Sequence, residues 1–216
     1  MHKNKSGNSN QLTLAIHNTN DSFGFAFRNC RDNLSDKFFF KKFDKDLCNN
    51  LIVDLTEFVG KKNLYKINKI SVSIGPSNFN ASRLIVVLAR TLSQQINCQL
   101  DSFSSFELMA KRIALKNNFN IDKQSFWIFN KLKRRGYIAG KYKIYNSYKN
   151  GDFFVSEIVI PKLLEKLSIE ENSFQAEYND LEDLRELLNL SNQKIKNSNY
   201  NSWKEVFPIY PISPIN

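Results

Sequence analysis

The residues best suited to chemistry in this chain are few and far apart. The sequence holds two histidines, His2 and His17, and three cysteines, Cys30, Cys48 and Cys98, with no Cys-x-x-Cys pair. A zinc peptidase needs two histidines spaced on one helix, and a cysteine nucleophile needs a histidine beside it. The sequence therefore predicts no catalytic residue and no metal ligand. The cysteines are expected to be small buried residues of a reduced protein.

A second candidate is the loop GPSNFNA at residues 75–81, which could face a phosphate group. A phosphate-binding loop needs several glycines, so that consecutive backbone N–H groups can approach the anion. This loop has one glycine, Gly75, and Pro76 has no N–H to donate. The loop is therefore predicted to be a structural turn that leads into a helix, and no cofactor is expected.

A third candidate is the basic and aromatic stretch at residues 131–145, KLKRRGYIAGKYKIY. Lys133, Arg134 and Arg135 could contact RNA phosphates while nearby tyrosines stack on bases. Those tyrosines are Tyr137, Tyr142 and Tyr145. A charged turn is more often solvated, with its aromatic residues packed inward, and the net charge of +10 is spread over the whole chain. The solvated hairpin is favoured, and an RNA-binding module over 131–145 stays as an alternative.

The elements that must position these residues centre on residues 69–98, which predict a strand, a tight turn and a helix. Ile70, Val72 and Ile74 alternate with serines, the pattern of a half-buried strand. Asn78 or Asn80 is expected to cap the helix. The residues predicted to form its core face are Ala81, Leu84, Ile85, Leu88, Leu92 and Ile96.

The same helix predicts a second apolar face. Val86 and Val87 lie beside the core face, and Arg83 and Arg90 border them a heptad apart. An apolar strip with flanking arginines is typical of a surface that meets a protein partner.

Periodicity and turn residues predict the remaining elements. Strands are expected at 12–16, 23–27, 36–43, 98–100, 125–130, 136–145 and 153–160, and helices at 44–59, 104–116 and 180–190. The first three strands are expected to form a meander, and Ser104 and Glu107 a capping box at the start of the helix 104–116. His17 is expected in a polar surface turn at 17–21, a short helix is expected from Pro161, and the acidic segment 165–186 is expected to be solvated. The chain divides into a disordered start at 1–11, a lobe at 12–116, and a second lobe with an extended tail at 117–216. The fold class is α/β, with mixed sheets and flanking helices.

Residues 75–83, GPSNFNASR, resemble the hallmark G-P-G-S-F-T-G-x-R of the TsaB family, also called YeaZ. The residues that match it in register are Gly75, Pro76, Phe79 and Arg83. The opening LAIHNTNDSFGFAF is similar to the family's L-A-I-D-T-S-T and its following strand, and Pro208 and Tyr210 match its P-x-Y close. The chain departs from the family at Ser77, which replaces the second loop glycine, and at His17, which replaces an early aspartate.

The resemblance implies the actin-like ATPase fold of two ribonuclease-H-like lobes. It also implies a non-catalytic scaffold that pairs with TsaD, together with the ATPase TsaE, to make N6-threonylcarbamoyladenosine in tRNA. An ATPase of this fold holds Mg²⁺ with an acidic residue after its first strand, where this chain has His17, so weak ATPase activity is only a further alternative. Because the apolar run at 12–16 is too short for a membrane span, a cytoplasmic protein is expected.

The residues expected to contact a TsaD-like protein are Leu51, Leu55, Arg83, Val86, Val87 and Arg90. They lie on the two helices that would pack against equivalent helices of that partner. A homodimer of the isolated chain is a further expectation, and contact with tRNA is expected to be indirect.

Overall fold

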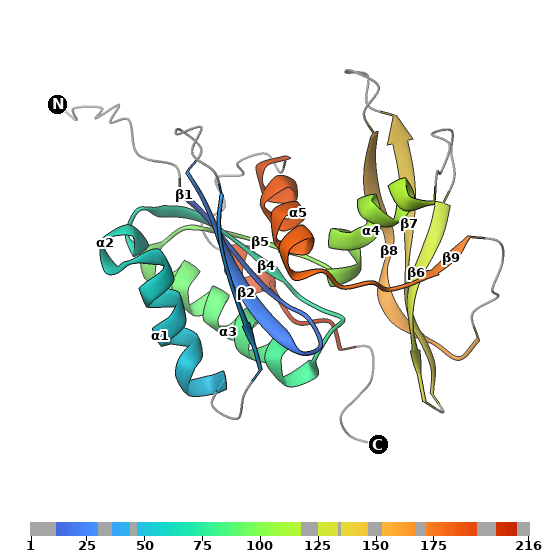
Figure 1. Ribbon diagram of the computed structural model, residues 1–216, viewed down its shortest axis with the longest axis horizontal. Coiled ribbons are helices and arrows are strands. Elements are labelled where there is room, and N and C mark those ends of the chain that lie inside the picture. The colour runs from blue at the N-terminus through green and yellow to red at the C-terminus, as the bar shows by residue number, and fades with distance from the viewer. Residues whose placement is uncertain are drawn as a thin grey trace.

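The computed structural model describes residues 12–29, 36–43, 47–117, 125–133, 135–146, 153–166, 172–193 and 202–210. They form two mixed α/β parts that lie side by side, each built on one open sheet (Figure 1). The predicted positions of residues 1–11, Cys30, residues 44–46, Arg134 and the turn at 149–151 lie outside the described residues, and so do the side chain of Cys48 and residues 211–216 of the tail. None of the helices in the described ranges is long and apolar enough to span a membrane.

The first sheet has five strands in the order β3-β2-β1-β4-β5. They are β1 (Leu12–Asn18), β2 (Ser22–Asn29), β3 (Lys37–Lys42), β4 (Ile67–Ser73) and β5 (Gln99–Phe103). The first three form an antiparallel meander, and β4 and β5 run parallel to β1. The predicted polar turn at 17–21 is shorter than expected, because β1 continues through Asn18.

Helices cover both faces of this sheet (Figure 1). On one face lie α1 (Leu47–Val59), α2 (Lys61–Leu64) and α3 (Phe79–Ile96), and on the other lies α5 (Asp180–Gln193). Leu14 and Ile16 of β1 pack toward α1 and α3. Ala15, between them in sequence, packs toward Leu184 of α5. Every residue of β1 is therefore buried, as in a strand covered on two sides.

The second sheet has the order β8-β7-β6-β9 and is covered by α4 on one face (Figure 1). Its elements are α4 (Ser105–Lys116), β6 (Ser125–Leu132), β7 (Gly136–Asn146), β8 (Phe153–Leu164) and β9 (Ser173–Gln175). Phe106 and Ile113 of α4 pack on Phe126 and Tyr142 of the sheet. The predicted cap of α4 is confirmed, since the Glu107 N–H donates to Ser104 Oγ at 3.0 Å.

Two expectations for the second half of the chain are wrong. Pro161 does not start a helix but lies inside β8, an edge strand, where a residue without an N–H is tolerated. The acidic helix α5 is not simply solvated, because Leu184, Leu187, Leu188 and even Asp183 are buried against the first sheet.

Two segments from beyond residue 117 complete the first part of the molecule. One is α5, and the other is the 3₁₀ helix η1 (Ser202–Glu205) with the residues after it, because Trp203 and Val206 pack into the core beneath α3. The predicted division of the chain into lobes at 12–116 and 117–216 stays a prediction. Residues from both sides of this division contribute to the first part of the molecule.

Candidate functional site

The loop after β4 is a sharp turn held at both ends. Gly75 has φ 92°, a backbone conformation that favours glycine, and the Gly75–Pro76 peptide is cis. The Gly75 carbonyl accepts from the Ser105 N–H at 2.7 Å, which ties the loop to the start of α4. Asn78 caps α3 as predicted, with Oδ1 accepting from the Ala81 N–H at 3.1 Å.

Hydroxyl groups of the loop meet the end of β1. Ser77 Oγ and Ser82 Oγ lie 2.8 Å apart, and the buried Asn18 amide donates to them at 2.8 and 3.3 Å. These polar groups satisfy one another. These bonds hold the loop after β4 and the first turn of α3 against the end of β1.

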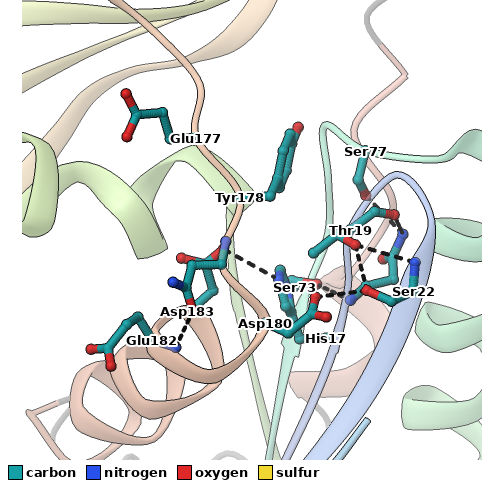
Figure 2. A network of polar contacts seen from close by, with 12 residues as sticks. His17, Thr19, Ser22, Ser73, Ser77, Glu177, Tyr178, Asp180, Glu182 and Asp183 are labelled. Carbon is teal, nitrogen blue, oxygen red and sulfur yellow. Dashed lines mark hydrogen bonds and ion pairs between the residues drawn. The ribbon is translucent and has the colours of Figure 1, made fainter. Parts of the chain in front are cut away.

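Tyr178 lies just before α5 (Figure 2), and its hydroxyl joins this loop to the second sheet. Its hydroxyl donates to the Pro76 carbonyl at 2.6 Å and accepts from the Asn130 amide of β6 at 3.0 Å. Burial of the hydroxyl raises the pKa of Tyr178, so the group stays protonated and remains a donor.

The start of α5 also contacts the turn between β1 and β2. Ser22 Oγ donates to Asp180 Oδ1 at 2.6 Å and lies 2.6 Å from Thr19 Oγ1 (Figure 2). These contacts link residues 158 positions apart in the chain. They fix the first turn of α5 over the end of β1.

The expectation that His17 lies in a polar surface turn is wrong. His17 lies inside β1 and is 1% exposed. Its Nε2 is 3.7 Å from Oδ2 of Asp183, a fully buried carboxylate on α5. Asp183 in turn accepts from Arg112 Nη1 and from the Asn179 N–H, both at 2.8 Å.

The sequence does not predict that Asp183 and Tyr178 take part in these contacts. Their segment showed only acidic residues with an amphipathic pattern, and nothing local marks Asp183 as buried. Its partners Arg112 and His17 lie 71 and 166 positions away in the chain.

A pocket of about 200 Å³ opens beside the loop. It lies where the loop, the ends of β6 and β7 and the C-terminal segment meet. Its lining residues are Pro76, Ser77, Phe79, Ser82, Leu132, Ile138, Ile209 and Tyr210. Phe79 packs on Tyr210 at 5.4 Å between ring centroids, and the Arg83 guanidinium lies 5.5 Å from the Phe79 ring. The pocket suits a small apolar group, and three of the four motif residues contribute to it or border it.

Comparisons with known proteins place this architecture. No family model matches the chain, and no curated protein matches it. A structure described as an uncharacterized protein with similarity to peptidase YeaZ from Pseudomonas aeruginosa has a TM-score of 0.63 at 12% identity, covering 94% of this chain and 100% of that chain. YeaZ from the same organism has a TM-score of 0.61 at 12% identity, covering 93% of this chain and 99% of that chain.

The chain has the YeaZ fold. The fold class predicted from the sequence is thereby confirmed, with two open mixed sheets and flanking helices. The likeness covers more than nine-tenths of this chain and therefore extends over both parts of the molecule.

Within the YeaZ fold, three of the six predicted interface residues are core residues. Leu51, Leu55 and Val86 are each at most 4% exposed. The expectation that Val86 lies on an open second face is wrong, because α3 is rotated so that Val86 faces the sheet beside Ile85. A side chain buried in the chain's own core is not available to a partner.

The other three interface residues differ among themselves. Val87 is 60% exposed and Arg83 is exposed. Arg90 instead contacts the chain's own C-terminal segment, with its guanidinium 4.7 Å from the Phe207 ring and 5.9 Å from the Trp203 ring.

Some of the exposed apolar residues on α1 and α3 are not among the predicted interface residues. Ile52 and Val53 of α1 are 61% and 53% exposed. On α3, Leu84, Leu88 and Leu92 are only partly buried and lie one turn apart. Together with Val87, these residues are the apolar side chains that α1 and α3 leave at least partly open.

Of the predicted RNA-contact residues, Lys133 and Arg135 lie exposed at the turn between β6 and β7, and Arg134 lies outside the described residues. The expectation that the aromatic residues pack inward is wrong for two of them. Tyr142 is fully buried, but Tyr137 and Tyr145 point to the side of the sheet away from α4.

Proposed function

We propose that this protein is a non-catalytic scaffold subunit that pairs with a TsaD-like protein in the machinery for N6-threonylcarbamoyladenosine in tRNA. A TsaE-like ATPase would complete the assembly. The observation that carries the proposal is the YeaZ fold over nearly the whole chain, combined with the matching residues Gly75, Pro76, Phe79 and Arg83.

The open surface of the helix layer supports a protein partner. Val87, Ile52 and Val53 are more than half exposed. Leu84 and Leu88, on the same helix as Val87, are half-buried, so a partner helix laid along α3 would bury apolar area without displacing core residues.

The internal contacts of the loop support a structural role for it. The loop hydroxyls pair with Asn18, and the Pro76 carbonyl accepts from Tyr178. In the proposed assembly the loop fixes the orientation of α3, and the partner subunit supplies the catalytic residues.

Co-purification of the tagged chain from its own cells tests the pairing, and a TsaD-like protein is the expected partner. Calorimetry with that purified partner then tests the surface. Val87→Asp should weaken binding at least about 30-fold, because an unpaired charge buried at an interface costs ~2–5 kcal/mol.

Leu115→Asp is the matched control, since Leu115 is 57% exposed on α4, away from the α1 and α3 layer. It should bind like the unaltered chain. Equal binding by both variants would place the interface elsewhere, and recovery of the chain without a TsaD-like protein would contradict the proposed function itself.

A further inference from the structure

The second sheet has one face covered by α4 and one face that no helix of the described chain covers (Figure 1). We call the second of these the outer face. Strand alternation decides which side chains it carries, because Phe126, Ile128, Tyr142 and Ile144 point to α4. The rings on the outer face are Trp127, Phe129, Tyr137, Tyr145 and Phe154, and the lysines are Lys131, Lys141, Lys143 and Lys162.

Rings and ammonium groups alternate across this face. Trp127 and Lys141 are directly opposite in the ladder, and Lys141 Nζ lies 5.5 Å from the Trp127 ring centroid. Lys143 Nζ lies 5.3 Å from the Tyr145 ring, which itself stacks on Phe154 at 5.2 Å with an interplanar angle of 12°. Phe129 and Tyr137 also lie on this face and meet edge to face, with ring centroids 5.6 Å apart. The face thus combines aromatic rings with positive charge.

The outer face is also free of negative charge among the described residues. The other residues at these ladder positions carry no charge, and they are Ser125, Ala139, Ser156, Val159, Leu164, Ser173 and Gln175. The carboxylate of β8, Glu157, points the other way and accepts from Ser104 Oγ at 2.5 Å and from Tyr142 Oη at 2.8 Å. The positive charge of the lysines is therefore uncompensated on this side.

We propose that the outer face binds a single-stranded nucleic acid. Aromatic rings stack on unpaired bases whatever their sequence, and lysines between the rings meet the phosphates. A lysine that leaves its ring for a phosphate exposes that ring to a base, so the two contacts form together. A protein partner fits less well, because the centres of protein interfaces are depleted in lysine.

This proposal does not rest on pairing with a TsaD-like protein. The outer face belongs to the second sheet, whereas the apolar surface of α1 and α3 lies on the first. Failure of either proposal leaves the other intact.

The test is fluorescence anisotropy of a labelled single-stranded RNA of about 12 nucleotides with the full chain, from about 50 to 200 mM salt. The double variant Lys141→Gln/Lys143→Gln should lower the magnitude of the slope of log K against log salt by about 1.4, because each lost contact to a single strand removes about 0.7.

The control double is Lys61→Gln/Lys62→Gln, which removes the same charge from exposed lysines of α2. Its slope should equal that of the unaltered chain. Equal loss in both doubles would show that binding follows net charge alone and would overturn the proposal.

A second variant separates stacking from charge. Tyr145→Leu should weaken RNA binding about fivefold or more with an unchanged salt slope, because a ring and not a cation is lost. Tyr65→Leu is its control, since Tyr65 is 85% exposed on the first part of the molecule. Thermal melts confirm that each variant is folded.

Three further results would overturn the proposal. One is the absence of RNA binding at about 50 mM salt. Another is equal binding of an RNA duplex, whose bases are already stacked. The third is a sedimentation change in Lys141→Gln/Lys143→Gln without a change in RNA binding, which would make the outer face a protein interface.

Discussion

At the scale of single residues, two polar side chains join segments that are far apart in the chain. The Tyr178 hydroxyl donates to the Pro76 carbonyl and accepts from the Asn130 amide. The Asp183 carboxylate of α5 accepts from Arg112 and lies beside the His17 ring. Cys98 behaves as the sequence predicts, since it is 3% exposed and burial raises the pKa of its thiol to about 12. A thiol in that state is a poor nucleophile at neutral pH.

Removal of the Tyr178 hydroxyl should destabilise the protein measurably. Tyr178→Phe leaves the Pro76 carbonyl and the Asn130 amide without their partner, and an unsatisfied buried polar group costs about 1–3 kcal/mol. Urea unfolding gives the free energy. Tyr65→Phe, at an exposed site, should change the free energy of unfolding by less than about 0.5 kcal/mol. Similar values for the two variants would show that the Tyr178 hydroxyl contributes no stability through these two bonds.

At the scale of elements, two helices begin with the caps that the sequence predicts, but the caps differ in what else they touch. The Asn78 Oδ1 atom accepts from the Ala81 N–H, and the Asn78 amide donates to the Asn20 carbonyl at 3.3 Å. Ser104 caps α4 and also contacts the Tyr142 hydroxyl at 3.1 Å and Glu157. The cap of α4 is thus also the joint between that helix and the second sheet.

Alanine at the two caps should therefore have unequal effects. Asn78→Ala should cost about 1 kcal/mol, the usual value for a helix cap. Ser104→Ala should cost about 2 kcal/mol or more, because it also removes a partner of a buried tyrosine and a carboxylate. Both values come from denaturant unfolding with a common slope, and equal costs would show that the contacts to β7 and β8 contribute nothing.

At the scale of the whole molecule, the two parts are joined by chain that crosses between them twice. After the second sheet the chain returns as α5 to cover the first sheet, and η1 packs beneath α3. Lys69 of β4 donates to the Ser191 carbonyl of α5 and pairs with Asp101 of β5 at 2.8 Å. A large buried area of the first part therefore depends on residues beyond 117.

A fragment of residues 1–117 should not fold cooperatively, because the face of β1 under α5 would be open to water. Circular dichroism during heating should show no sharp transition for the fragment. A single sharp transition, with dispersed amide signals in NMR, would show that this segment is an independent domain.

A pair of variants in the full chain tests the same dependence. Leu187→Asp places a charge at a fully buried site of α5 and should cost more than about 3 kcal/mol. Leu181→Asp, on the same helix at 37% exposure, should cost about 1 kcal/mol or less.

Local patterns in the sequence determined the antiparallel opening, the turn at Gly75 and the caps at Asn78 and Ser104. The physical reason is range, since a cap bonds an N–H three residues away and strand alternation needs only neighbours. The YeaZ-like motif at 75–83 was readable for the same reason.

Only the tertiary structure decided which side of each element is buried. Val86 is buried because the side of α3 that carries it packs on the first sheet. His17 and Asp183 are buried because α5 packs across β1. Tyr137 and Tyr145 point outward because α4 takes the other face of their strand. Burial depends on what packs from distant parts of the chain, and no pattern within one segment contains that information.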